Sequence, residues 1–312
     1  MVSTAGTLQT SAAAPSYAAS SQQASFFSAL NTVRAAAGAG VVDQSTTIDV
    51  ASQAHADYLT ANITTTTDLH SEVSTKTGYY GDTLATRLTK AGYSYGFATE
   101  VVGGTGASLS ATDCVYGLMD TVYHAAALLS QETAVGVGIG SDAASIPLCV
   151  SDLADASTDS YGQVPASGAL IAYPFSGQTS VAGTFYVAYE EPRPSATLFP
   201  NTTAGTPIVV RLRNADFVNA QAAGTLAATV TQFTLTDAGG NIVQAAILAA
   251  PDVTGSGVTL NSDSNLGDGF VILVPLSPLA ANATYTAHFS STLTASGTAL
   301  TKTWSFTTGS SS

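Results

Sequence analysis

The chain has 312 residues and carries 8 Lys and Arg against 21 Asp and Glu, a net charge of −13. Binding to nucleic acid needs clustered Lys and Arg to neutralise phosphates, so this balance argues against such a partner. The hydrophobic fraction of 45% can supply buried cores, and the length predicts two domains. No segment reaches the roughly 18–20 uninterrupted apolar residues of a membrane span, so we expect no membrane-spanning segment.

The composition points to an exported protein, although the N-terminus has no basic region followed by an apolar core and thus no recognisable secretory signal. Ser, Thr, Ala and Gly take the surface positions that Lys and Glu usually fill, which is common in exported bacterial proteins. We therefore expect a secreted, extracellular or periplasmic protein.

The first predicted elements are a disordered tail over residues 1–21 and a helix over residues 22–37. The tail has no apolar period, whereas the helix has one and ends at Gly38 and Gly40. A second helix starts at a cap of Thr46 or Thr47 and carries His55 on its apolar face.

A polar loop with His70 and Glu72 precedes a third predicted helix over residues 82–90, which stops at Gly92. A glycine-rich stretch over residues 103–106 follows Glu100. A fourth helix is predicted as one continuous segment over residues 111–129, with an apolar stripe along one face.

The pattern then switches to short strands. Residues 135–140 alternate with period two, and residues 148–150 form a second strand. The polar stretch over residues 155–167 suggests a boundary near residue 163. No helical period follows, so residues 164–309 are predicted to form an all-β sandwich, which makes the chain α+β.

Two cysteines, Cys114 and Cys149, allow one disulfide or none. A disulfide would close a loop of about 35 residues, worth roughly 3–4 kcal/mol in the chain-entropy model. Two buried free thiols are the alternative.

Several motifs in the first half recur in one order and together resemble a known family. They are Asn31-Thr32-Val33-Arg34, Ala54-His55-Ala56-Asp57-Tyr58-Leu59, Leu69-His70-Ser71-Glu72, Gly81-Asp82-Thr83-Leu84-Ala85-Thr86-Arg87, Tyr123-His124-Ala125-Ala126-Ala127-Leu128-Leu129 and Val135-Gly136-Val137-Gly138. Residues 22–155 resemble a bacterial domain of the CAP superfamily, related to cysteine-rich secretory proteins. The resemblance implies an α-β-α sandwich and assigns residues 22–163 to this CAP-like domain.

The resemblance also implies a groove that holds two histidines and two acidic residues. By motif, these include His70, Glu100 and His124. The second acid is missing, because Ala134 stands where relatives often have Glu. Asp120, one helical turn before His124, is a candidate to replace it. Glu72 ranks below Glu100 as a further groove residue.

The two imidazoles of His70 and His124 could ligate a divalent cation such as Zn²⁺, with Glu100 orienting a ring nitrogen or a bound water. Alternatively, the histidines pair with Glu100 or Glu72 and only join the loop to the fourth helix. His55, on an amphipathic helix, is interpreted as a core or boundary histidine.

The second half resembles a bacterial Ig-like module. The segments that carry this resemblance are Glu190-Glu191-Pro192-Arg193-Pro194, Ala283-Thr284-Tyr285-Thr286-Ala287 and Trp304-Ser305-Phe306. Trp304 and Phe306 are two residues apart, so they should share the core face. This module is interpreted as a spacer, or as an adhesion surface for a host or envelope protein.

The CAP resemblance leads to a first hypothesis of a non-enzymatic protein that binds a lipid, a sterol or another cell-envelope component. Tyrosines that cluster in the first half could form the floor of such a binding site. The alternatives are a metal-assisted hydrolase of peptide or cell-wall bonds, with Glu100 as general base, and a surface adhesin with a vestigial groove.

Overall fold

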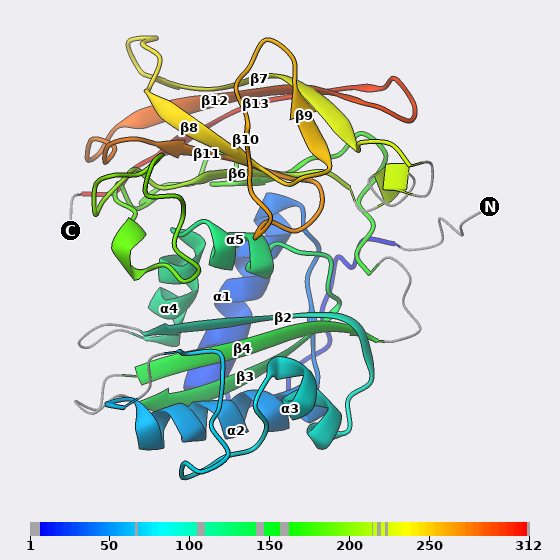
Figure 1. Cartoon of the computed structure of the whole chain (residues 1–312), viewed down its shortest axis with the longest axis vertical. Helices are drawn as coiled ribbons and strands as arrows, with labels where there is room; N and C mark the ends of the chain where they lie inside the picture. The colour runs from blue at the N-terminus through cyan, green and yellow to red at the C-terminus, as the bar shows by residue number, and fades with distance from the viewer. Residues whose placement is uncertain are drawn as a thin grey trace.

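The computed structural model describes residues 7–65, 68–104, 110–141, 147–156, 162–213, 215–216, 220–221 and 224–310. Its helices and strands stack as layers (Figure 1). One pair of helices covers the outer face of a first sheet, and three helices lie between this sheet and a β-rich region. The β-rich region adds two further sheets.

The first sheet has the strand order β1-β3-β4-β2. Its members are β1 (Asp43–Gln44), β2 (Tyr95–Gly104), β3 (Ala134–Ser141) and β4 (Pro147–Ala156). The alternating run predicted over residues 135–140 is confirmed as β3, and the short strand predicted over residues 148–150 lies at the start of the longer β4. The sequence analysis did not identify β2, which holds Glu100.

Helix α1 (Gln22–Ala37) ends as predicted, because Gly38 adopts a left-handed conformation with φ of 85°. Helix α2 (Thr46–Asn62) is capped by Ser45, whose hydroxyl accepts from the Ile48 N–H, so the predicted Thr cap was wrong by one or two residues. Helix α3 (Leu84–Ala91) has a Thr83 capping box and stops at Gly92, as expected.

The continuous helix predicted over residues 111–129 is wrong, because the structure has two helices there. They are α4 (Ala111–Met119) and α5 (Tyr123–Leu128). The carboxylate of Glu190 accepts hydrogen bonds from the N–H groups of Val122 and Tyr123, at 2.8 and 2.6 Å. These N–H groups start a new helix instead of continuing the old one, so the break is held by a residue distant in sequence.

Glycines in β3 let α2 pack directly on the first sheet. A Cβ at Gly138 would lie 2.1 Å from the Ser52 carbonyl oxygen, and one at Gly136 would lie 2.4 Å from the backbone of Ile48. Neither position can hold a side chain without moving the helix. The alternation that predicted the strand therefore also sets the distance between α2 and the sheet.

The β-rich region contains a five-stranded sheet with the order β10-β8-β11-β6-β5 and a four-stranded sheet with the order β13-β12-β7-β9. The first holds β5 (Ile171–Tyr173), β6 (Ile208–Arg211), β8 (Ala245–Ala249), β10 (Asn261–Ser262) and β11 (Phe270–Pro275). The second holds β7 (Ala228–Asp237), β9 (Val253–Gly255), β12 (Thr284–Leu293) and β13 (Ala299–Thr307), and a 3₁₀ turn, η1, spans Val187–Tyr189.

The five-stranded sheet is buried on both faces. On β11, Val271 and Leu273 pack towards the four-stranded sheet, among residues that include Trp304 and Phe306, as their spacing predicted. Phe270 and Ile272 join a second cluster, which also contains side chains of α1, α4 and α5. One hydrophobic core therefore runs across the boundary predicted near residue 163; residues 157–161 of that stretch lie outside the described residues.

The segment over residues 7–21, expected to be a disordered tail, is hydrogen-bonded to the first half where it is described. The Gln9 N–H donates to the side-chain oxygen of Gln163 at 2.8 Å, and the Ala13 N–H donates to Asp43 at 2.7 Å. The Tyr17 hydroxyl donates to Asp49. These contacts fix the segment along α2 and β1.

Cys114 of α4 and Cys149 of β4 form a disulfide, so the alternative of two free thiols is excluded. It joins the middle helix layer to the first sheet. No helix in the described part of the chain is long and apolar enough to cross a membrane.

Candidate functional site

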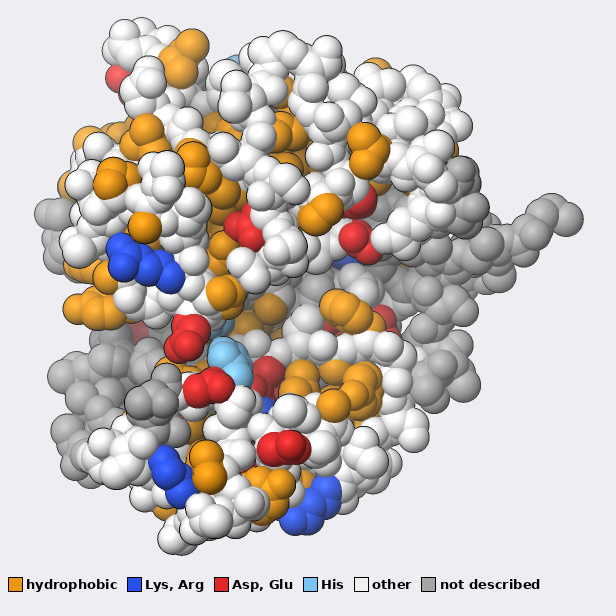
Figure 2. Space-filling model, in the orientation of Figure 1, with side chains coloured by type: hydrophobic (Ala, Val, Ile, Leu, Met, Phe, Trp, Pro, Cys, Tyr) orange, Lys and Arg blue, Asp and Glu red, His pale blue; other side chains and the backbone are white. Residues whose placement is uncertain are grey.

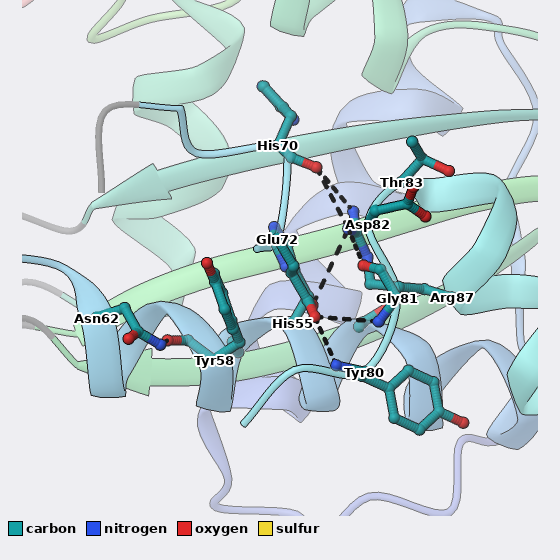
Figure 3. Close-up of polar contacts among 12 residues, drawn as sticks. His55, Tyr58, Asn62, His70, Glu72, Tyr80, Gly81, Asp82, Thr83 and Arg87 are labelled. Carbon is teal, nitrogen blue, oxygen red and sulfur yellow. Dashed lines mark hydrogen bonds and ion pairs between the residues drawn. The ribbon is translucent and has the colours of Figure 1, made fainter. Parts of the chain in front are cut away.

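His55 of α2 and Glu72 form the centre of a buried polar network in the first half (Figure 3). The His55 Nδ1 lies 2.9 Å from Glu72 Oε1, and its Nε2 lies 2.8 Å from the Leu69 carbonyl oxygen. The other oxygen of Glu72 accepts from the N–H groups of Tyr80 and Gly81 at 2.6 and 3.1 Å. This confirms that His55 is a core histidine.

These contacts also fix the charge on Glu72 and give each ring nitrogen of His55 a partner. A carbonyl oxygen only accepts, so Nε2 must carry a proton. Burial alone would raise the pKa of Glu72, but the hydrogen bonds from His55, Tyr80 and Gly81 hold it below the usual value. Glu72 is thus ionised, and its Oε1 lies against the Nδ1 of His55.

Arg87 of α3 and Glu100 of β2 extend the network. The Arg87 guanidinium donates to Glu100 Oε2 at 2.6 Å and to the carbonyl oxygens of Gly81 and His70 at 3.2 Å. Glu100 Oε1 lies 3.0 Å from His70 Nδ1 and 3.9 Å from His55 Nε2. The Arg87 guanidinium therefore lies within ion-pair distance of both buried carboxylates, at 2.6 Å from Glu100 and 4.0 Å from Glu72.

Burial and hydrogen-bond partners act in opposite directions on the pKa values of Glu100 and His70. Burial alone would raise the pKa of Glu100, but its hydrogen bond to His70 and the charge of Arg87 lower it to about 2. Burial alone would lower the pKa of His70, but the hydrogen bond to Glu100 and the charges of Glu100, Asp68 and Glu191 raise it. His70 is the exposed end of the network, with 34% of its side chain accessible.

Asp152 of β4 lies opposite Glu100 in the sheet and accepts from the Ser52 hydroxyl at 2.9 Å. Burial and the charge of Glu100 raise the pKa of Asp152 well above its usual value. Asp152 is therefore held neutral beside the ionised Glu100, and the network gains no third negative charge.

His124 of α5 belongs to a different set of contacts. Its Nδ1 lies 3.1 Å from the Thr121 hydroxyl and 3.4 Å from Glu190 Oε1. Glu190 is buried, and the same carboxylate caps the first turn of α5. His124 is therefore tied to the β-rich region rather than to the His70–Glu100 pair.

A pocket of about 590 Å³ lies between the first half and the β-rich region, beside His124. Asp120, at the break between α4 and α5, also lines it, together with Gly117 and Leu118. The opposite wall is the segment before and within η1. It contributes five lining residues, Ala182, Thr184, Phe185, Tyr186 and Tyr189.

The carboxyl group of Asp120 has no hydrogen-bond or ion-pair partner among the residues that the structure describes. Removal from water raises the pKa of Asp120 to about 8. Figure 2 shows acidic side chains and a histidine gathered in the hollow between the upper, β-rich part and the lower part of the molecule.

The five predicted groove residues therefore fall into two groups. His70, Glu72 and Glu100 share the buried network, whereas Asp120 and His124 line the pocket. Glu132, near the position of the missing acid, instead accepts from the Thr99 hydroxyl at 3.0 Å. Asp120 and His124 line the same pocket, although the continuous helix that would place them one turn apart is broken between them.

The described residues hold no group of three or more His, Cys, Asp or Glu side chains arranged to bind a metal ion. His70 and His124 each face a separate carboxylate, Glu100 and Glu190. A zinc site needs at least three protein ligands that converge on one point, so these residues do not fit the ion expected from the sequence.

Sequence reasoning missed Arg87, Asp152 and Glu190 as site residues. A signal existed for Arg87, since a charged residue between Leu84 and Leu88 falls on the apolar face of a short helix. Asp152, within a short apolar strand, gave a similar signal. Nothing local marks Glu190, which acts 68 residues away from Val122.

Residues 27–150 match the family described as "CAP: Cysteine-rich secretory protein family". No curated protein matches the chain. Among solved structures, an outer surface protein from Borrelia burgdorferi is similar at 16% identity, over 45% of this chain and 96% of that chain, with a TM-score of 0.37. That likeness is too low to carry an argument, so the family match alone leads to the conclusion that this chain contains a CAP family domain at residues 27–150.

Proposed function

We propose that this is an exported, non-enzymatic binding protein that takes a small apolar molecule, of the lipid or sterol class, into the pocket beside His124. The observation that carries the proposal is the pocket itself, whose volume of about 590 Å³ is in the usual range for small-molecule sites. Its walls are largely apolar and aromatic, and a few polar groups are placed among them.

The buried network, which lies apart from the pocket, favours binding over catalysis. The carboxylates of Glu72 and Glu100 are already engaged by cations and backbone N–H groups, so neither is free to act as a general base. Nothing in the described part of the structure favours the hydrolase or the adhesin alternative. The disulfide between Cys114 and Cys149 supports export, because such bonds persist in oxidising compartments.

The β-rich region would then complete the site as well as act as a spacer. Phe185 and Tyr186 belong to this region and form one wall of the pocket. Two sheets packed face to face support the Ig-like assignment that the sequence suggested, which remains part of this proposal.

Gly117 offers a direct test, because a Cβ at this exposed position of α4 meets no atom within 4 Å. Gly117→Leu should fill the pocket, while Gly117→Ala is the matched control with the same gain in helix propensity. Binding would be measured by titration with a fluorescent sterol and a fluorescent fatty acid. Solvent extraction and mass spectrometry of the purified protein would identify retained ligands.

We expect the parent and Gly117→Ala to bind one of these probes alike, and Gly117→Leu to bind it at least tenfold more weakly. Equal binding by all three proteins would place the ligand elsewhere. No binding and no extracted lipid in the parent would refute the proposed function.

A further inference from the structure

Asp120 is distinguished from the other carboxyl groups around the helix layer by where it lies. It lines the pocket beside His124 and also two neighbouring cavities, of about 500 and 240 Å³. All three cavities follow the contact between α4 and the segment over residues 180–185, and Ala182 is the other residue that they share. Asp120 therefore lies at the junction of the three cavities.

The lining of the main pocket is negative and aromatic. Of the described residues that line it, two are Asp, none is Lys or Arg, and three are aromatic. The rings of Tyr186 and Tyr189 lie 6.0 Å apart at an angle of 32°. They remain 52% and 86% exposed, so their faces are open to an incoming group.

The two acidic residues of the pocket differ in their partners. Asp113 accepts from the N–H and the hydroxyl of Ser110 at 2.8 and 2.9 Å, within the capping box of α4. Asp120 has no such partner among the described residues, and removal from water holds its carboxyl group largely protonated at neutral pH. A positively charged ligand group would supply the missing partner and displace that proton.

The carboxyl group of Asp120 and the rings of Tyr186 and Tyr189 together favour a positively charged ligand. Aromatic faces attract cations through their quadrupole, and a carboxylate adds a direct ion pair. We infer that the pocket is a site for an organic monocation with an apolar body, such as an alkylammonium amphiphile, whose ammonium head pairs with Asp120 and contacts Tyr186 and Tyr189. This inference rests on the proposed function and names the ligand class of the same pocket.

Three probes with the same six-carbon chain test whether the pocket selects a ligand by its charge. They are the cation hexyltrimethylammonium, the neutral alcohol hexanol and the anion hexanoate. Their affinities for the full chain would be measured by calorimetry at pH 8.5. We expect the cation to bind at least tenfold more tightly than the alcohol, and hexanoate to bind most weakly. Asp120→Asn should bring the cation within threefold of the alcohol.

Two further variants control this result. Asp57→Asn makes the same change in net charge on an exposed face of α2 and should leave all three affinities unchanged. Gly117→Leu should weaken all three probes together. Calorimetry in buffers of different ionisation enthalpy should show a proton released by the parent at pH 7 when the cation binds, and none by Asp120→Asn.

The pH dependence has more than one contributor, since Asp120 shares its surroundings with Asp113, Tyr116, His124, Tyr173, Tyr186 and Tyr189. The Asp120→Asn comparison therefore decides the matter. If hexanol binds as tightly as the cation, or Asp120→Asn keeps full cation affinity, the inference is overturned while the proposed function stands. If none of the probes binds and no lipid is extracted, both fail.

Discussion

The buried network around Arg87 and the pocket around Asp120 treat charge in opposite ways. In the network, the ionised carboxylates of Glu72 and Glu100 both lie within 4.0 Å of the Arg87 guanidinium, and the pKa of the third carboxyl group, Asp152, is raised by burial and by the charge of Glu100. In the pocket, Asp120 is only partly buried and has no hydrogen-bond or ion-pair partner among the described residues. Removing one partner of a paired buried charge destabilises a fold, whereas a carboxyl group without a partner leaves an interaction for a ligand.

The largest expected effect comes from breaking the buried network. Arg87→Met should lower the free energy of unfolding by about 3–5 kcal/mol, because Glu100 and Glu72 would stay buried with less compensation. Urea denaturation would measure it. Arg213→Ala is the matched control, since Arg213 pairs with Asp216 at 2.7 Å near the surface and its loss should cost under about 1 kcal/mol. Equal losses in both variants would contradict the paired, buried network.

The next effect concerns the residue that joins the two regions. Glu190→Ala should lower the free energy of unfolding by about 1–3 kcal/mol, because the N–H groups of Val122 and Tyr123 lose a charged acceptor. Glu190→Gln keeps one acceptor oxygen and should lie between it and the parent. Amide hydrogen exchange at the start of α5 should speed up in Glu190→Ala, and unchanged exchange there would show that another group caps the helix.

The raised pKa of Asp120 should make the free energy of unfolding depend on pH. Its pKa is raised from near 4 when unfolded to about 8 in the fold, so between these values the native state holds the extra proton. Stability should therefore fall as pH rises through this window, by up to about 1.4 kcal/mol per pH unit from this group. Asp120→Asn should flatten that slope and raise the melting temperature at pH 8. An identical slope in parent and variant would show that Asp120 is ionised throughout.

The smallest effect belongs to the exposed end of the network. The pKa of His70 is raised in the fold, so its pairing with Glu100 stabilises fully below the unfolded pKa near 6.5 and is lost as pH rises through the higher folded value. His70→Asn should cost under about 1 kcal/mol at pH 5.5 and less at pH 9, because the side chain is partly exposed. Thermal melts at both pH values would measure it, and a larger cost at pH 9 would reverse the assignment.

The sequence predicted elements whose determinants are local. Gly38 and Gly92 end helices through their own backbone conformation, and the alternation over residues 135–140 is read within one strand. The break between α4 and α5 depends on Glu190, so no window of neighbouring residues contains it. Strand β2 was missed because its exposure does not alternate, since its two faces meet different layers.

The same division holds for the site. Motif order placed His70 and Glu100 together correctly, because the two belong to segments that pack within one half. It also joined His124 to them, although the contact of His124 with Glu190 is made by a region that the motifs do not cover. Aromatic residues of the pocket wall, such as Tyr189, carried no signal because their role arises only where two regions meet.

The five-stranded sheet, buried on both faces, has a consequence for a protein cut in two. Separated at residue 163, each fragment would expose one side of a shared core that includes Phe26 and Leu128 on one part and Ile272 and Phe270 on the other. Such surfaces are complementary in shape and apolar, which is what drives two polypeptides to associate. Fragments 1–163 and 164–312, produced together, should therefore reassemble into a non-covalent heterodimer, and each alone should aggregate.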